Sequence, residues 1–336
     1  MPERNPSDEL DEAVDAIMTD PEATIPRVTP RLAALLQVAA DLRELPRADF
    51  KDRLRTALRA GGRALATGPE IAARLAEMAK EPRFVVHDLA AALRDLPEMR
   101  MRFLTSLDGC TIGVSRFSAM SHWERHPAGD ELLHLLDGEA DVVTLTDDGP
   151  VRSVLRAGSI FVCPRGLWHQ ILPRSPLSLF FATPGGDTEH SAAPTHTPSG
   201  TAPPLAAHDV RAALHALPEL AITRATTGVE AAAAVRTLTT LGPATVGVMR
   251  YSGLTPWERH PDGDELLHVL DGEVDVTVLT EDGTRHAVVP AGSIFVCPRG
   301  LWHRQLPRPS VTMLYGTPSR TTEVSWADDP RSGGEA

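Results

Sequence analysis

The spacing of apolar residues along this chain changes near residue 80. Before that point the spacing is helical. Thr29-Pro30 offers a capping hydroxyl followed by a proline at the first helical position, and leucines at helical intervals come after it. A second predicted helix ends at Gly61-Gly62, and a third follows it. We therefore expect residues 1–80 to form a helical N-terminal region.

From Thr111 onward the apolar runs become short and are broken by proline, glycine and aspartate. Asp148-Gly149 and Asp282-Gly283 lie between alternating segments, and such pairs are typical of β-hairpin turns. Many short strands separated by regular turns are typical of a sandwich or a barrel. The predicted fold class is mainly β.

Most of this β region occurs twice. Residues 123–169 return as residues 257–303 at a constant offset of 134, and 35 of the 47 paired positions are identical. A short helix is predicted before each copy, at His87–Glu98 and at His208–Glu219. The second copy gains 13 residues around Glu230–Val235. An internal repeat of this length fixes the architecture, so we expect two sibling β-domains.

The repeat and the composition between its copies give the expected domain boundaries. The stretch between the copies is rich in proline, threonine and alanine, which is typical of a linker. The expected organisation is a helical region over 1–80, a first barrel over 87–185, a linker over 186–207, a second barrel over 208–325 and a tail over 326–336.

Composition narrows the classes of protein to which the chain can belong. Its 336 residues are 42% hydrophobic and 23% charged, a globular balance, and its formal net charge of -12 argues against nucleic-acid binding. No apolar run approaches 18 residues, and the acidic N-terminus lacks a signal pattern. Three cysteines are too few for a disulfide framework. We expect a soluble, cytoplasmic protein that binds neither nucleic acid nor membrane.

The repeated unit holds acidic and histidine side chains at a spacing that suits a metal. Glu124 and His126 share a strand face because they are two residues apart. Glu131 follows a tight turn and begins the next strand, and His169 comes from a strand remote in sequence. Two imidazoles and a carboxylate converging inside a small barrel suit Fe, Mn, Ni, Zn or Cu. Glu124 either joins these ligands or acts as a base.

The second copy retains every one of these side chains. The corresponding residues are Glu258, His260, Glu265 and His303.

These residues resemble the two motifs of the cupin superfamily, G-x5-H-x-H-x3/4-E-x6-G and G-x5-P-x-G-x2-H-x3-N. The matching positions are His126, Glu131, Gly138, Gly158, Pro164, Gly166 and His169, and in the second copy His260, Glu265, Gly272, Gly292, Pro298, Gly300 and His303.

The chain departs from the family pattern at two places in each copy. Glu124 and Glu258 replace the first histidine of the first motif, and Leu172 and Leu306 replace the final asparagine of the second. The resemblance covers about 220 residues and implies a bicupin, that is, two tandem RmlC-like jelly-roll barrels.

The resemblance also implies a set of metal ligands and a class of chemistry. The implied ligands of a divalent metal ion are His126, Glu131, His169, His260, Glu265 and His303, with Glu124 and Glu258 as catalytic candidates.

Two classes of function remain open on the sequence. The first is a small-molecule enzyme with one metal per barrel, a mononuclear-metal oxidoreductase of the dioxygenase type in preference to a sugar isomerase or decarboxylase. The second is a non-catalytic small-molecule or metal sensor in which the N-terminal helices serve as the output or partner element. Either protein binds a small molecule, and homodimerisation stays open.

Two further pairs of residues in the repeat have predicted structural roles. His134 and His268 lie three positions after the glutamates, so strand alternation places them on the opposite face, where we expect them to pack between the barrel and its neighbours. Cys163 and Cys297 lie in apolar strands, where we expect buried and inert thiols.

Overall fold

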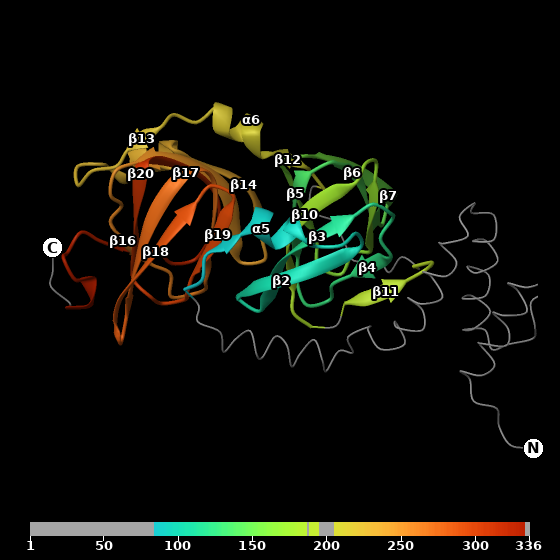
Figure 1. The fold of residues 1–336 in the computed structure, drawn as a ribbon, viewed down its shortest axis with the longest axis horizontal. Helices are drawn as coiled ribbons and strands as arrows, with labels where there is room; N and C mark the ends of the chain where they lie inside the picture. The colour runs from blue at the N-terminus through green and yellow to red at the C-terminus, as the bar shows by residue number, and fades with distance from the viewer. Residues whose placement is uncertain (1–83, 187, 195–204, 333–336) are drawn as a thin grey trace, which may run out of the picture. The chain divides into compact units, whose positions relative to one another are not determined.

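The computed structural model describes residues 84–186, 188–194 and 205–332 of the chain. These residues form two β-barrels that follow one another in sequence (Figure 1). The mainly β, tandem jelly-roll prediction is therefore confirmed. The predicted N-terminal helices of residues 1–80 lie outside the described residues.

The first barrel consists of two sheets that face each other across an apolar interior. One sheet has the order β8-β5-β10-β3-β2 and the other the order β11-β4-β9-β6-β7. Its strands are β2 (Arg100–Leu107), β3 (Cys110–Phe117), β4 (Trp123–Arg125), β5 (Glu131–Asp137), β6 (Glu139–Thr146), β7 (Gly149–Arg156), β8 (Ser159–Cys163), β9 (His169–Pro173), β10 (Leu177–Pro184) and β11 (Glu189–Ser191).

The second barrel repeats this arrangement with two long strands that each pass from one sheet to the other. Its elements are β13 (Leu220–Ala221), α7 (Gly228–Ala233), β14 (Val235–Leu241), β15 (Ala244–Ser252), β16 (Trp257–Arg259), β17 (Glu265–Thr280), β18 (Gly283–Pro290), β19 (Ser293–Cys297), β20 (His303–Pro318), β21 (Glu323–Ser325) and the 3-10 helix η2 (Pro330–Ser332). Strand β17 corresponds to β5 and β6 together, and β20 corresponds to β9 and β10. The 13 extra residues of this copy include the short helix α7, which Thr227 and Glu230 cap reciprocally.

A glycine in each barrel allows the strand that begins at the ligand glutamate to bend. Gly138 has φ of +90° and Gly272 has φ of +80°. A Cβ on Gly138 would lie 2.5 Å from the carbonyl oxygen of Pro176, and one on Gly272 would lie 2.2 Å from that of Ser310. Both the left-handed backbone and the close approach exclude other residues.

Each barrel extends the sheet that faces the other barrel with a short strand that precedes that other barrel. Strand β1 (His87–Asp88) pairs with β19 of the second barrel, and β12 (His208–Asp209) pairs with β8 of the first. The helices that follow are α5 (Leu89–Arg94) and α6 (Val210–His215), capped by Asp88 and Asp209. The predicted helices His87–Glu98 and His208–Glu219 are thus correct in position but too long, because their first residues pair as strand across the barrels.

Two aspartates form reciprocal contacts between the barrels next to the ligand glutamates. The carboxylate of Asp130 accepts hydrogen bonds from the backbone N–H groups of Arg165, at 2.7 Å, and of Gly242 in the second barrel, at 2.9 Å. Asp264 does the same for Arg299, at 2.7 Å, and for Asp108 of the first barrel, at 3.1 Å. The turn before each ligand glutamate is therefore held by both barrels.

The outward face of the same strands packs into an apolar core between the barrels. Residues on either side include Leu132 and Leu266, both 1% exposed. His134 and His268 lie in this interface with ring centroids 5.2 Å apart, so the predicted packing role is confirmed. Their Nδ1 atoms are buried without a hydrogen-bond partner among the described residues.

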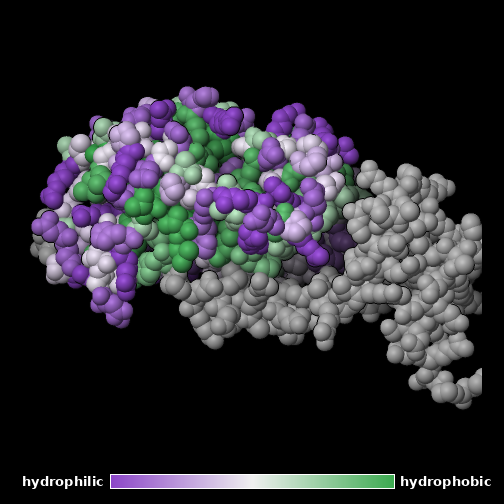
Figure 2. All heavy atoms as spheres, viewed as in Figure 1, coloured by the Kyte–Doolittle hydropathy of each residue, from purple (hydrophilic) through white to green (hydrophobic). Residues whose placement is uncertain are grey.

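The outer surface of the barrels is mixed in character. Hydrophilic side chains are spread over it with hydrophobic residues exposed between them (Figure 2). Among the described residues, no helix combines the length and apolar character needed to cross a bilayer.

The histidine pair predicts an acid-sensitive stability. Burial lowers the pKa of His134 to about 4, and burial together with His134 lowers the pKa of His268 well below 6.5. As pH falls below about 6.5, the unfolded chain binds protons that the folded chain does not. The free energy of unfolding should therefore fall by about 1.4 kcal/mol per pH unit for each imidazole. Urea denaturation at pH 7.5 and 5.5 measures this loss.

The comparison is with variants that lack these imidazoles. His134→Leu with His268→Leu should reduce the loss of stability between the two pH values by on the order of 1 kcal/mol per imidazole. His122→Leu removes an exposed imidazole of the first barrel and should leave the loss unchanged. An equal loss in the double variant and the native protein would contradict this assignment.

Candidate metal centres

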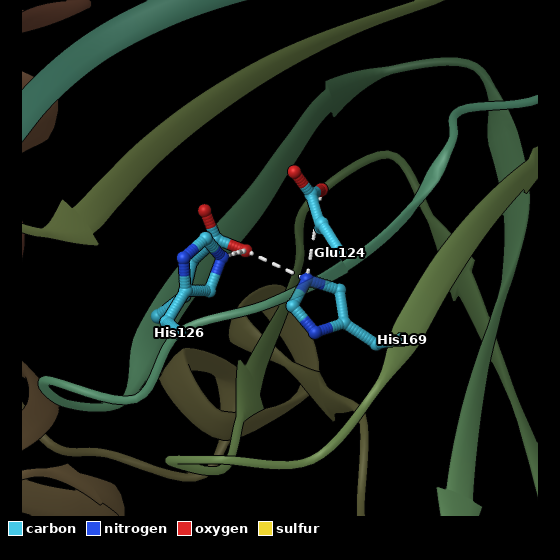
Figure 3. Close-up of side chains that lie close together, drawn as sticks. Glu124, His126 and His169 are labelled. Carbon is cyan, nitrogen blue, oxygen red and sulfur yellow. Dashed lines mark hydrogen bonds and ion pairs between the residues drawn. The ribbon is translucent and has the colours of Figure 1, made fainter. Parts of the chain in front are cut away.

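Four side chains of the first barrel converge from three strands and one turn. Glu124 lies on β4, His126 directly follows that strand, Glu131 begins β5 and His169 begins β9. Backbone pairing of Glu124 with His169 brings the two ends of this group together. One ligand atom from each of the four side chains lies within 4.8 Å of the others. Figure 3 shows Glu124, His126 and His169 pointing toward one another.

The carboxylate of Glu131 is at the centre of this group. Its Oε2 lies 3.1 Å from Nε2 of His169 and 3.3 Å from Nε2 of His126. Oε1 of Glu124 lies 3.6 Å from Nε2 of His169. The two histidines and Glu131 are buried, whereas the side chain of Glu124 is 23% exposed. Three groups thus form a buried set, and Glu124 lies at its accessible side.

The second barrel repeats the geometry. Nε2 of His303 lies 3.0 Å from Oε2 of Glu265, and Nε2 of His260 lies 3.5 Å from Oε1 of the same residue. Glu258 completes the group within the same 4.8 Å limit. The histidine ring centroids are 5.3 Å apart in both barrels. The structure therefore brings together all eight predicted site residues, four in each barrel.

The hydrogen bonds of the histidines indicate that a cation fits between these groups. Nδ1 of His169 faces the carbonyl oxygen of Leu167 at 3.4 Å, and a carbonyl can only accept, so Nδ1 carries the proton. In the neutral ring Nε2 then carries a lone pair, which points at the carboxylate of Glu131. Nε2 of His126 is buried and makes no hydrogen bond within the described residues. A proton or a metal ion resolves this opposition, and the four converging donor atoms suit a divalent metal.

The charges in the second barrel support the same reading. Burial by itself would raise the pKa of the Glu265 carboxyl, but His260 and His303 hold it well below its usual range. Burial by itself would lower the pKa of His303, but Glu265 and Glu258 raise it above 6.5. The pocket therefore favours an ionised glutamate beside a positive charge. Burial, followed by repulsion from Glu265, raises the pKa of Glu258.

Sequence reasoning missed the hydroxyl groups that orient the predicted ligands. The hydroxyl of Thr183 donates to Oε1 of Glu131, which leaves Oε2 for the imidazoles. The hydroxyl of Thr317 donates to Oε1 of Glu265 in the same way, and Oε2 of Glu265 faces His303. Thr188 lies 3.2 Å from Nδ1 of His126, on the side of the ring away from Glu131. Thr322 lies 3.1 Å from Nδ1 of His260. Such partners fix ring orientation and ligand basicity.

A signal for these threonines was present in the sequence. Thr183 and Thr188 recur as Thr317 and Thr322 at the same offset of 134. They lie outside the highly identical block of 47 residues, so a comparison extended beyond that block would have found them.

The buried cysteines lie where the sequence predicted. Cys163 and Cys297 are each 1% exposed and face the ligand glutamates across paired strands. Burial raises the pKa of Cys163 to about 11. The thiol therefore stays protonated at neutral pH, which makes it a poor nucleophile.

Comparisons with known proteins match the second barrel most directly. Residues 247–305 match the cupin domain family. A germin-like protein, subfamily 2 member 4, from Arabidopsis thaliana is 44% identical over 54 residues, which is 16% of this chain and 24% of that relative. The chain therefore covers about a quarter of the length of this curated relative.

Two solved structures align with the chain at low sequence identity. A cupin 2 conserved barrel domain protein from Leptotrichia buccalis aligns over 71% of this chain and 99% of its own, with a TM-score of 0.48 and 14% identity. Oxalate decarboxylase from Bacillus subtilis, a protein with Mn(II) centres, aligns over 65% of this chain and 71% of its own, with a TM-score of 0.44 and 13% identity.

The threonine contacts give a testable effect on metal affinity. Thr183→Val with Thr317→Val removes the hydroxyls that orient both glutamates, and should weaken binding of Mn²⁺ or Co²⁺ about 10–100-fold. Isothermal titration calorimetry measures the affinity. Thr183→Ser with Thr317→Ser retains the hydroxyls and should stay near the native value. If the valine and serine variants bound metal equally, the orienting role would be wrong.

Proposed function

We propose that this chain, which belongs to the cupin superfamily, holds one divalent metal ion in each barrel and uses it in small-molecule chemistry of the dioxygenase type. The observation that supports the proposal is the buried glutamate facing two imidazoles, with a threonine hydroxyl behind it, in both barrels. Leaving a carboxylate buried without a cation would be costly, so a metal explains the arrangement. When bound, the ion would supply Lewis acidity and, for Fe, Mn or Cu, one-electron redox chemistry.

The four side chains of each centre have two roles: three would bind the metal, and one would transfer a proton. His126, His169 and Glu131 are the buried set, and three protein ligands leave positions open for water or substrate. Glu124 is the accessible carboxylate, and its Oε1 lies beside Nε2 of His169. We assign to Glu124 the role of taking a proton from, or returning one to, a small molecule bound next to the metal. Glu258 has the same role in the second barrel.

Removal of the histidines tests the metal assignment. His126→Ala with His260→Ala should reduce the metal content of the purified protein from about two ions per chain to a small fraction of that value. The reason is that each centre of the double variant lacks one of its three ligands. The measurement is elemental analysis, with β-sheet circular dichroism as the check on folding. His122→Ala changes an exposed histidine of the first barrel and should bind metal normally. Unchanged metal content in the double variant would refute the ligand assignment.

Replacement of the accessible glutamates tests the chemistry separately. Glu124→Gln with Glu258→Gln should retain the metal but slow O2 consumption with diols or phenols about 100-fold or more, because the general base is lost. An oxygen electrode gives the rate, and Glu98→Gln on the exposed surface is the matched control. If the native protein loads with redox metal yet turns over none of these substrates, the dioxygenase assignment fails and a sensor explains the site better.

A further inference from the structure

The only two tyrosines of the chain, Tyr251 and Tyr315, both lie in the interior wall of the second barrel. The equivalent positions of the first barrel, at the offset of 134, are Phe117 and Phe181. The candidate metal-binding side chains are identical in the two barrels, whereas each of these two phenylalanines is a tyrosine in the second barrel.

The neighbours of these aromatic residues change in the same direction. The hydroxyl of Tyr251 donates to Oε1 of Gln305, whereas the equivalent pair in the first barrel is Phe117 and Ile171. The tyrosine at position 251 is therefore accompanied by a polar residue at position 305, and the hydrogen bond between them satisfies both buried side chains.

The second aromatic position also changes from hydrocarbon to hydroxyl. Phe181 and Phe103 of the first barrel pack edge to face with centroids 6.3 Å apart and an interplanar angle of 89°. The equivalent residues of the second barrel are Tyr315 and Thr237, so both members of this contact carry a hydroxyl group there.

These polar side chains lie in the same interior as the metal-binding group. Gln305 is two residues after His303 on β20, so the two share the inward face. Tyr315 is two residues before Thr317, whose hydroxyl contacts Glu265. A Cβ at Gly247 would lie 2.4 Å from the hydroxyl oxygen of Tyr315, so only glycine fits there. The tyrosine hydroxyls are therefore held in place beside the centre.

Wall polarity decides which molecule each centre accepts. A hydroxyl group of a ligand gives up its hydrogen bonds to water when it enters the barrel, and a hydrocarbon wall offers no new hydrogen-bond partner. The wall of the first barrel therefore disfavours hydroxylated molecules. In the second barrel an apolar ligand would leave the remaining hydrogen-bond capacity of the Tyr251 hydroxyl and the Gln305 amide unmatched. Each mismatch changes affinity about tenfold or more.

We propose that the two centres share one metal chemistry but select different ligands, and this proposal rests on the metal assignment above. The first barrel takes a small molecule that carries an aromatic or branched aliphatic group. The second barrel takes a small hydroxylated molecule, which the Tyr251, Gln305 and Tyr315 side chains recognise by hydrogen bonds.

Single-centre proteins test the selectivity. His260→Ala with His303→Ala leaves only the first centre, and His126→Ala with His169→Ala leaves only the second. Each is loaded with Co²⁺, checked for one ion per chain, and titrated with benzoate and with glycolate while the Co²⁺ absorption spectrum is recorded. Both probes carry one carboxylate, so they differ only in the rest of the molecule, which is an apolar ring in benzoate and a hydroxymethyl group in glycolate. The ratio of benzoate affinity to glycolate affinity should be at least tenfold higher for the first centre.

Exchanging the walls tests the residues themselves. In the second-centre protein, Tyr251→Phe with Gln305→Ile installs the pair of the first barrel and should shift the ratio about tenfold toward benzoate with metal content unchanged. The reverse exchange, Phe117→Tyr with Ile171→Gln in the first-centre protein, should shift it toward glycolate. Circular dichroism verifies that each variant is folded.

The outcomes separate this proposal from the proposed function. If neither single-centre protein takes up Co²⁺, the metal assignment is wrong. If both take it up but show the same ratio, or if the exchanged walls leave the ratio unchanged, then the metal assignment stands and the difference in selectivity is overturned.

Discussion

The structure of each barrel is organised around one buried carboxylate that faces two imidazoles. Glu131 is almost fully buried, and its oxygens contact His126, His169 and Thr183. An ionised carboxylate in such surroundings is stable only when its charge is matched and its oxygens are hydrogen-bonded. Strands remote in sequence must therefore meet at this point, and the bend at Gly138 and the pairing of β4 with β9 bring them there.

Each barrel also contributes to the centre of the other. Asp130 and Asp264 accept backbone hydrogen bonds from the opposite barrel directly before Glu131 and Glu265, and β1 and β12 exchange between the two sheets that face each other. The outward residues of the strands that carry Glu131 and Glu265 build the core between the barrels. The two centres are therefore positioned by one shared interface, and a single barrel would lack part of the support for its own ligands.

Duplication preserved the candidate metal-binding side chains and changed the walls around them. These side chains, their threonine partners and the glycines at the bends recur at one offset. The interior aromatic residues do not, because Phe117 and Phe181 correspond to Tyr251 and Tyr315. The hydroxyl of Tyr251 has a buried partner in Gln305. Metal binding would constrain donor atoms to a narrow geometry, whereas the surrounding wall can exchange the Phe117–Ile171 pair for a hydrogen-bonded pair of similar size without disturbing the barrel.

The sequence by itself predicted the two-barrel architecture and the four side chains that meet in each barrel. The repeat gives the number of barrels, and the two-residue period of a strand fixes that Glu124 and His126 share a face and that His134 faces the opposite way. It did not determine the true extent of the helices after His87 and His208, which oxygen of the glutamate each threonine contacts, or the exchange of strands between barrels. The direction of a side chain on a strand follows from local covalent geometry, so it can be read from the sequence. The partner of a strand edge or of a carboxylate oxygen depends on contacts between distant segments, and only the folded chain brings these segments together.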